Sequence, residues 1–462
     1  MKITFYGGAK TVTGANYLLD NGEIKILVDC GLYQGSKYSE DFNYEKFVYN
    51  PAEINFVFIT HSHTDHIGRI PKLFKEGFRG RVIASKPTID LAKKALPDNL
   101  KIVTEEAKRE GREPMFEPKD LDGVLGLAEG FDYEVPIDLG GGIMATLHDA
   151  GHILGSSIVE IDFYAEGGSA SGGNVTKKIY FSGDLGNPPT PLLQPPYFPK
   201  DADYVVVESA YGSRIHEDRS TRKIILENVI KETLSKGGTL MIPSFAMERT
   251  QELLYELNQL VNRNQIPRVP IFVDSPLAIN LTEVYRKYPN YFNKTAHHVI
   301  ESGDDIFNFP GLTFTRTSDE SKAINNVKGP KIIIAGSGMS TGGRILHHEM
   351  RYLSDPNSAI LFVGYQVQGS LGRRILDGEK NVQIFGQKIV VNCKIYAIGG
   401  YSAHADQAML LKWIQSAGSG GNLKKVFMVQ GEEDSSTILA EKTKTDLKIE
   451  ATVPSQGESF EL

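Results

Sequence analysis

The sequence has little or none of several features that would point to particular classes of protein. Among 462 residues there are 2 cysteines, Cys30 and Cys393, which are too few for a disulfide framework and are not spaced as a metal-binding pair. Each follows an apolar run, which predicts buried thiols. No apolar run approaches the roughly 18 residues of a membrane span, and the N-terminal residues lack a signal peptide's apolar segment. We therefore expect a cytoplasmic protein with no membrane association.

The chain also lacks an excess of basic residues, because 57 acidic residues outnumber 50 basic ones and give a formal net charge of −7. This balance argues against a histone-like or tail-driven nucleic-acid binder, although a local basic groove remains compatible with it. The hydrophobic content of 40% is that of an ordinary globular protein. A chain of this length exceeds the size at which a single core keeps growing, so two domains are expected.

Short apolar runs rich in valine and isoleucine recur along the chain and often end on polar or glycine-rich residues. Such runs are typical of strands that helices bury on both faces, which predicts an α/β fold. In α/β folds, functional sites lie beyond the carboxyl ends of the strands, where these polar residues collect. The runs occupy residues 54–60, 178–184, 203–209, 238–244, 269–275, 331–338, 359–365, 394–404 and 424–432.

The segment HSHTDH, residues 61–66, places three of the chain's 11 histidines within six positions, directly after a predicted strand. His61 and His63 are two residues apart, so an extended backbone can aim both rings at one point. Asp65 and His66 would point elsewhere as the chain turns into a helix. Zinc prefers imidazole nitrogen and carboxylate oxygen, so the spacing predicts two adjacent metal ions.

Two later residues have suitable surroundings to complete this site. His152 in DAGHILGS and Asp184 in FSGDLGN both lie among small residues that allow close backbone approach. A carboxylate commonly bridges two zinc ions, and Asp184 is the natural candidate. Two such ions would share a water molecule and stabilise the charge of an in-line phosphoryl displacement.

These motifs resemble the signature of the metallo-β-lactamase fold, with Asp29 of LVDCGLYQG steadying the metal loop. YVVVESAYGSRIHE, with Glu208, and GGYSAHAD, with His404, resemble the extra motifs of the β-CASP branch of RNA- and DNA-processing nucleases. GSGMSTGGRILHH and GYQVQGSLGRRIL are similar to its prokaryotic RNA-specific members, relatives of the cleavage and polyadenylation endonuclease subunit.

The resemblance implies a metallo-β-lactamase αββα sandwich with an inserted α/β β-CASP cap. Its implied parts are residues 1–208 and 395–462 for the sandwich and 209–394 for the cap. It implies a zinc-dependent ribonuclease that hydrolyses single-stranded RNA through a metal-activated hydroxide. His404 would be the general acid, held by Glu208, and Asp65 would also act in catalysis. A homodimer is one option for the assembly.

The chain departs from the family at one position. The RNA-specific members carry a histidine ligand to the second metal where this sequence has Gln430, in VFMVQGEED. A neutral amide is a poorer zinc ligand than imidazole. We expect weak occupancy of the second zinc site, or tolerance of manganese there.

Substrate contacts are harder to predict. Ser402, Arg344 and Arg249 are candidates, and the glycine-rich residues 336–344 would form either a phosphate cradle or a tight turn. The competing hypotheses are a DNA-directed nuclease, another metallo-hydrolase such as a thioesterase, and an RNA-binding scaffold weakened by Gln430. Endonuclease and 5′-exonuclease modes both remain open.

Overall fold

The computed structural model describes residues 1–35, 40–164, 176–216 and 221–462. The chain forms two compact units. The first comprises Met1–Ile215 and Ala403–Leu462, and the second comprises His216–Ser402. The glycine-rich run 167–174, which the sequence predicts to be a hairpin or loop, lies outside the described residues.

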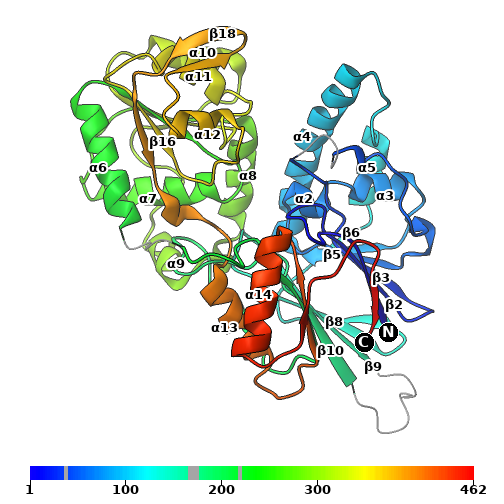
Figure 1. The fold of residues 1–462 in the computed structure, drawn as a ribbon. Helices are drawn as coiled ribbons and strands as arrows, with labels where there is room; N and C mark the ends of the chain where they lie inside the picture. The colour runs from blue at the N-terminus through cyan, green and yellow to red at the C-terminus, as the bar shows by residue number, and fades with distance from the viewer. Residues whose placement is uncertain (36–39, 165–175, 217–220) are drawn as a thin grey trace. The chain divides into compact units, whose positions relative to one another are not determined.

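The first unit contains two seven-stranded sheets. In the first sheet, β22 and β1 pair side by side, so both ends of the chain contribute to the same sheet (Figure 1). In spatial order this sheet consists of β22 (Ser459–Glu461), β1 (Lys2–Gly7), β2 (Asn16–Asp20), β3 (Lys25–Val28), β4 (Phe56–Phe58), β5 (Arg81–Ser85) and β6 (Ala128–Phe131). The second consists of β21 (Ala451–Thr452), β20 (Lys425–Val429), β11 (Tyr204–Glu208), β10 (Thr176–Phe181), β9 (Ser157–Tyr164), β8 (Ile143–Asp149) and β7 (Ile137–Gly140).

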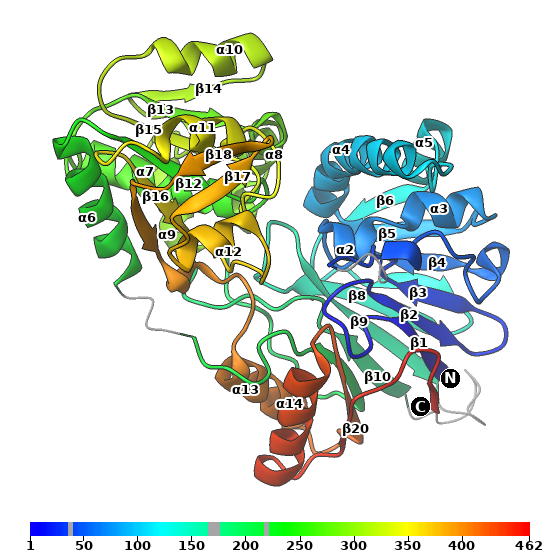
Figure 2. The same ribbon diagram turned by 45° about the horizontal axis from the view of Figure 1, so that its top comes forward.

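The two sheets of the first unit face each other and form a four-layered sandwich with helices outside (Figure 2). Phe5 and Val28 of one sheet share a buried core with Phe181 and Phe427 of the other. A second core lies between the first sheet and its helices, and a third between the second sheet and its own. The helices are α2 (Thr64–Ile67), α3 (Ile70–Lys75), α4 (Lys86–Glu110) and α5 (Pro118–Leu125) on one side, and α13 (Gln407–Ala417) and α14 (Glu433–Asp446) on the other. The predicted αββα sandwich is confirmed.

The second unit is built on a six-stranded, all-parallel sheet. Its strands carry the continuous apolar runs seen in the sequence, because helices cover both faces. In spatial order they are β14 (Leu312–Phe314), β13 (Ile271–Asp274), β15 (Lys331–Ala335), β12 (Thr239–Pro243), β16 (Ala359–Phe362) and β19 (Lys394–Ala397). Its helices are α6 (Arg222–Ser235), α7 (Arg249–Asn262), α8 (Pro276–Lys287), α9 (Lys294–Glu301), α10 (Ser318–Ala323), α11 (Ile345–Tyr352) and α12 (Leu371–Leu376). A hairpin of β17 (Asn381–Ile384) and β18 (Gln387–Val390) completes the unit.

The boundaries between the units lie further along the chain than the sequence predicts. The predicted divisions are after residues 208 and 394, whereas the structure divides the chain after Ile215 and Ser402. The second difference has a clear cause, because β19 pairs in parallel with β16 and therefore belongs to the second unit. The first arises because the turn after β11 stays on the first unit, where Ser435 Oγ donates to the carbonyl of Ser209 at 2.8 Å.

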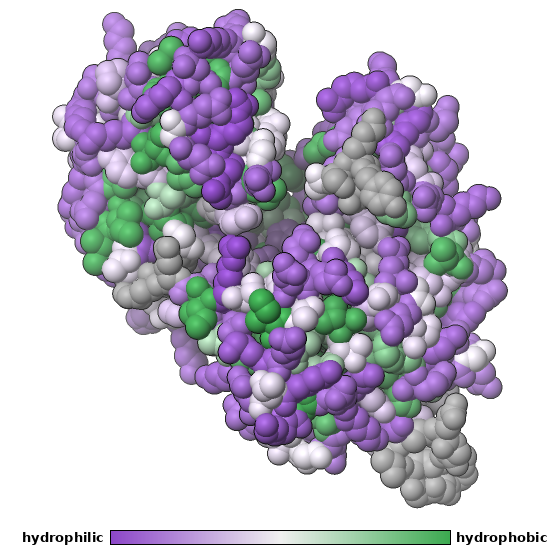
Figure 3. Space-filling view, viewed as in Figure 1, coloured by the Kyte–Doolittle hydropathy of each residue, from purple (hydrophilic) through white to green (hydrophobic). Residues whose placement is uncertain are grey.

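Both cysteines are buried, as predicted, and burial raises the pKa of the Cys30 thiol to about 11. In the part of the chain that the structure describes, no helix is long and apolar enough to span a membrane. On the face shown in Figure 3, hydrophobic residues form small groups among hydrophilic ones.

Candidate metal centre

The side chains predicted to bind metal lie at one edge of the first unit, because each follows the carboxyl end of a strand. HSHTDH begins three residues after the end of β4, and His152 is the third residue after the end of β8. Asp184 follows β10 by three residues, and Glu208 is the last residue of β11. β4, β8, β10 and β11 all point toward this edge, so residues far apart in the sequence converge there.

His61, His63, His152 and Asp184 form a tight group in which one ligand atom from each lies within 4.8 Å of all the others. His61 Nε2 and His63 Nδ1 are 3.0 Å apart, and His152 Nε2 lies 3.3 Å from the same His63 atom. Asp184 Oδ2 is 3.4 Å from His61 Nε2 and 3.5 Å from His152 Nε2. Four nitrogen and oxygen donors converging on one point are the donor set that zinc and similar cations bind.

The protonation of these side chains suits a cation. Burial, together with neighbouring histidines, lowers the pKa values of His61, His63 and His152, so their rings are neutral and keep a lone pair for a metal. Burial acts against ionisation of Asp184, but the adjacent His66 and His61 hold the pKa of this carboxyl well below its usual range. The group therefore fits one metal ion.

A second group, which shares Asp184, contains Glu208 and His404. His404 Nδ1 lies 3.2 Å from Glu208 Oε2 and 3.8 Å from Asp184 Oδ2. Glu208 is fully buried, and its other oxygen accepts a 2.7 Å hydrogen bond from the backbone N–H of Leu185. Burial favours the neutral ring of His404, but the carboxylates of Glu208 and Asp184 raise its pKa to about 9. The two carboxylates thus favour the protonated form of the His404 ring.

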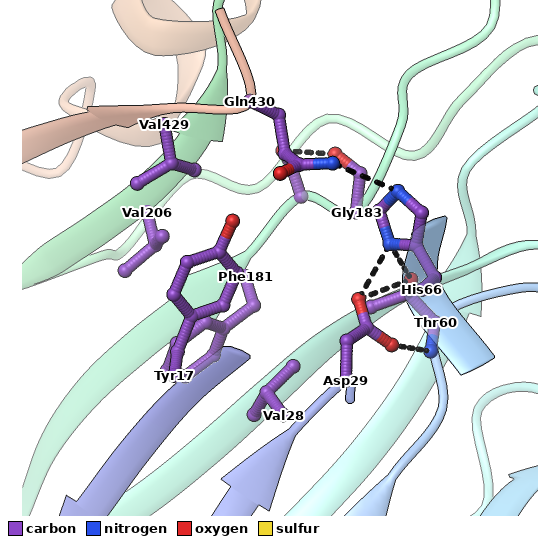
Figure 4. A pocket seen from close by; sticks show the side chains of 11 residues that line it. Tyr17, Val28, Asp29, Thr60, His66, Phe181, Gly183, Val206, Val429 and Gln430 are labelled. Carbon is purple, nitrogen blue, oxygen red and sulfur yellow. Dashed lines mark hydrogen bonds and ion pairs between the residues drawn. The ribbon is translucent and has the colours of Figure 1, made fainter. Parts of the chain in front are cut away.

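Both ring nitrogens of His66 are hydrogen-bonded to protein side chains (Figure 4). His66 Nδ1 donates to Asp29 Oδ2 at 2.7 Å, and Asp29 also accepts from the N–H and the hydroxyl of Thr60, both at 2.8 Å. The side-chain amide nitrogen of Gln430 lies 3.1 Å from His66 Nε2. Gln430 is 3% exposed, and its amide oxygen has no hydrogen-bond partner within the described residues. Asp29 therefore orients the metal loop, whereas Gln430 occupies the nitrogen that a second metal would need.

The remaining predicted ligands do not gather into a comparable second group. Asp65 Oδ2 is 3.8 Å from His66 Nε2, and His66 Nε2 is 3.4 Å from Asp184 Oδ1. Among the described residues, the metal-sized groups of three or more ligands include neither Asp65 nor His66. The donor set thus fits one metal ion at His61, His63, His152 and Asp184, and the ligands predicted for a second ion, beside Gln430, are less closely grouped.

The predicted substrate contacts lie in the second unit, and two of them are engaged internally. Arg344 donates to Asp274 Oδ1 at 2.7 Å and to the backbone carbonyls of residues 315 and 316. Arg249 is 7% exposed and pairs with Glu252. Ser402 is half-buried just after a short 3₁₀ helix. Arginines held in this way have fewer donors left for a substrate.

The glycine-rich residues 336–344 close on themselves. The hydroxyl of Ser337 accepts hydrogen bonds from the N–H groups of Thr341 at 2.9 Å and Gly342 at 3.2 Å. Ser337 N–H in turn donates to the Gly342 carbonyl at 3.0 Å. These bonds favour the tight turn over the phosphate cradle, because three of the N–H groups that a phosphate would use already have partners.

Two residues at the site are absent from the sequence-based predictions. Thr60 binds Asp29 and lies within 3.3 Å of a ring nitrogen of His66. Gly31 packs so closely against the metal loop that a β-carbon there would lie 1.4 Å from the Asp65 carbonyl oxygen. Thr60 directly precedes HSHTDH, so its place in the sequence could have identified it as a neighbour of the site. The contact of Gly31 is a property of the folded loop alone.

An αββα sandwich with histidines and a carboxylate gathered at its strand ends is a metallo-hydrolase fold with a cluster that suggests metal binding. Comparison with family models agrees. Residues 18–167 match a metallo-β-lactamase superfamily domain, residues 250–375 a Beta-Casp domain, and residues 388–454 a Zn-dependent metallo-hydrolase RNA specificity domain.

The chain is 38% identical to "Ribonuclease TTHA0252" of Thermus thermophilus, over 94% of both chains. It is also 30% identical to "Transcription termination factor FttA" of Methanocaldococcus jannaschii, over 98% of this chain and 70% of that one. The chain therefore belongs to the β-CASP family of metallo-β-lactamase-fold proteins. Among solved structures, a protein of unknown function from Enterococcus faecalis shares the fold over 99% of both chains, with a TM-score of 0.54 and 12% identity.

Proposed function

We propose that this protein is a metal-dependent ribonuclease that hydrolyses phosphodiester bonds in single-stranded RNA. The observation that carries the proposal is that a one-metal donor set and the Glu208–His404 pair lie side by side and share Asp184. The RNA specificity domain match and the ribonuclease relative support RNA over DNA as the substrate.

His61, His63, His152 and Asp184 would hold the metal, which we propose to be zinc. A bound zinc ion lowers the pKa of water toward neutrality and stabilises negative charge on a phosphoryl group. The neutral rings of the histidines would keep their lone pairs for the metal, and burial of His61, His152 and Asp184 limits competing water, while His63 is half-buried.

We assign the proton transfer to His404. Hydrolysis of a phosphodiester leaves a sugar oxygen that must gain a proton as it departs. The raised pKa of His404 favours the form that carries that proton, and Glu208 contacts the ring through Nδ1, so Nε2 would be the donating atom. Leu185 in turn holds Glu208 through its backbone N–H, so the acid is supported on a strand end of the sheet.

For the second metal we propose weak or absent binding. The Gln430 amide would have to leave His66 Nε2 before that nitrogen could bind a cation. Its oxygen is a neutral and weak ligand compared with an imidazole. On this proposal Asp65, which the sequence predicts to bind the second metal and to act in catalysis, would lie beside the first metal site and have at most a weakly bound metal of its own.

The test is incubation of end-labelled RNA and DNA oligonucleotides of the same sequence with the protein, with and without chelator. We expect cleavage of RNA that chelator abolishes and zinc restores, and the labelled products separate endonuclease from 5′-exonuclease action. His404→Ala should retain metal, measured by mass spectrometry, while cleavage collapses. Unaltered cleavage by this variant would remove His404 from the mechanism, and RNA binding without cleavage by the wild type would favour the scaffold hypothesis.

A further inference from the structure

Three neighbouring strands of the second unit end side by side. β15, β12 and β16 are adjacent in the parallel sheet, and their carboxyl ends lead into residues 336–344, 244–248 and 363–370. Two large aromatic side chains are exposed in these loops. Phe245 is 40% exposed and Tyr365 is 55% exposed. Rings at the carboxyl edge of a parallel sheet are in the usual position for ligand contacts in this class of fold.

The Phe245 ring is held against the backbone of both neighbouring loops. A β-carbon at Gly338 would lie 2.7 Å from the ring, and one at Gly364 would lie 3.3 Å from it. The Phe245 carbonyl accepts a 2.7 Å hydrogen bond from the hydroxyl of Thr250, which fixes the backbone. The ring is therefore positioned by its surroundings while two fifths of its surface faces solvent.

The loop that carries Tyr365 is tied to the same place. The amide NH₂ of Gln366, a side chain only 2% exposed, donates to the carbonyls of Gly338 and Gly364, both at 3.0 Å. Gly372 N–H, in the first turn of α12, donates to the Met339 carbonyl at 3.1 Å, which ties the helix after this loop to residues 336–344. These contacts fix the backbone on both sides of Tyr365, so little ordering is needed when its ring binds a ligand.

The cation beside the rings is already paired. Arg373, in α12, donates through Nε to both carboxylate oxygens of Asp377 at 2.9 Å. The rings themselves are therefore the groups available to a ligand, and exposed aromatic rings bind single-stranded nucleic acid because bases of any kind stack on them.

We propose that Phe245 and Tyr365 stack against bases of single-stranded RNA. The inference rests on the proposed ribonuclease function and assigns to the second unit the binding of RNA bases. Stacking is tolerant of base identity, so we expect binding with little sequence preference.

The test measures binding of a fluorescent oligouridine by anisotropy, with chelator present to prevent cleavage. Phe245→Ala and Tyr365→Ala should each weaken binding by roughly 5- to 150-fold, which corresponds to about 1–3 kcal/mol per stacked base. Phe245→Trp should restore binding. Phe385→Ala is the matched control, because Phe385 is also an exposed ring (56%) of the second unit but lies in the β17–β18 turn, and its loss should leave affinity unchanged.

A second arm separates stacking from a structural role. An abasic oligomer of the same length should bind the wild type more weakly, and the alanine variants should show little further loss with it. Equal losses with normal and abasic oligomers, or alanine variants that bind like the wild type, would overturn the inference. If the wild type neither binds nor cleaves RNA, the proposed function itself fails, and the two failures are therefore distinguishable.

Discussion

Substitution of Gln430 by histidine should convert this protein from binding one metal ion to binding two. The backbone of Gln430 has a φ of 50°, in the left-handed region, and histidine is among the residues that tolerate this conformation. The change replaces the amide that hydrogen-bonds His66 Nε2 with an imidazole that can itself bind a cation. It leaves His61, His63, His152 and Asp184 unchanged.

The magnitude follows from what the second metal must displace. Breaking the buried hydrogen bond between Gln430 and His66 costs about 1–3 kcal/mol, which weakens metal binding there by roughly 5- to 150-fold. Loss of an imidazole ligand weakens it further, since the amide oxygen is less basic. Wild-type protein should therefore hold about one tightly bound zinc, whereas Gln430→His should hold about two.

The assay is zinc titration of metal-free protein by calorimetry, with bound metal counted by mass spectrometry after dialysis. Gln430→Asn is the matched control, because asparagine also tolerates a positive φ but its shorter side chain brings no imidazole to the site. Gln430→Asn removes the hydrogen bond to His66 but adds no ligand, so its second-site zinc affinity should rise only by the amount that breaking this hydrogen bond costs the wild type. Two zinc ions bound with equal affinity by the wild type and Gln430→His, together with equal cleavage, would show that this position does not control the second site.

Three further outcomes are expected. Glu208→Gln keeps an oxygen for the Leu185 N–H but loses the charge that holds His404, so kcat should fall at least tenfold while zinc content stays the same; an unchanged kcat would contradict the role given to Glu208. Gly31→Ala should abolish zinc binding or folding, seen by mass spectrometry and circular dichroism, since its β-carbon would overlap the Asp65 carbonyl. Burial raises the pKa of Glu349 from 4.5 to about 8, so between these pH values the native state keeps a proton that the unfolded chain releases. The free energy of unfolding should therefore decrease as the pH rises from 4.5 to 8, by up to about 1.4 kcal/mol per pH unit. Glu349→Gln should flatten that fall in denaturant titrations, and identical slopes in the two proteins would show that Glu349 does not titrate in this way.

The sequence located much of the site because the relevant signals are local. HSHTDH follows an apolar strand, and the small residues around His152 and Asp184 mark places where the backbone can approach closely. Strand periodicity likewise predicted both α/β units, because burial on two faces demands continuous apolar runs. These features depend on neighbours in the chain, so they can be inferred without coordinates.

The unit boundaries could not be set in the same way. β19 has an apolar pattern like that of any other strand, and only its pairing with β16 assigns it to the second unit. Arg344 shows the same limit. It is a plausible RNA contact by residue type, yet the folded chain pairs it with Asp274, 70 positions away. Partners that far apart leave no local signal, whereas Glu252 lies only three residues after Arg249.

By itself, the sequence determined which residues are candidates for the chemistry, through the ligand types and spacing of HSHTDH, His152 and Asp184 and through the family resemblance of the motifs of Glu208 and His404. The tertiary structure alone decided which of them lie together. It gathered four ligands around one point and placed His404 against Glu208. It also set the Gln430 amide on His66, 364 positions apart in the chain, because two sheets packed face to face bring their strand ends to a common edge.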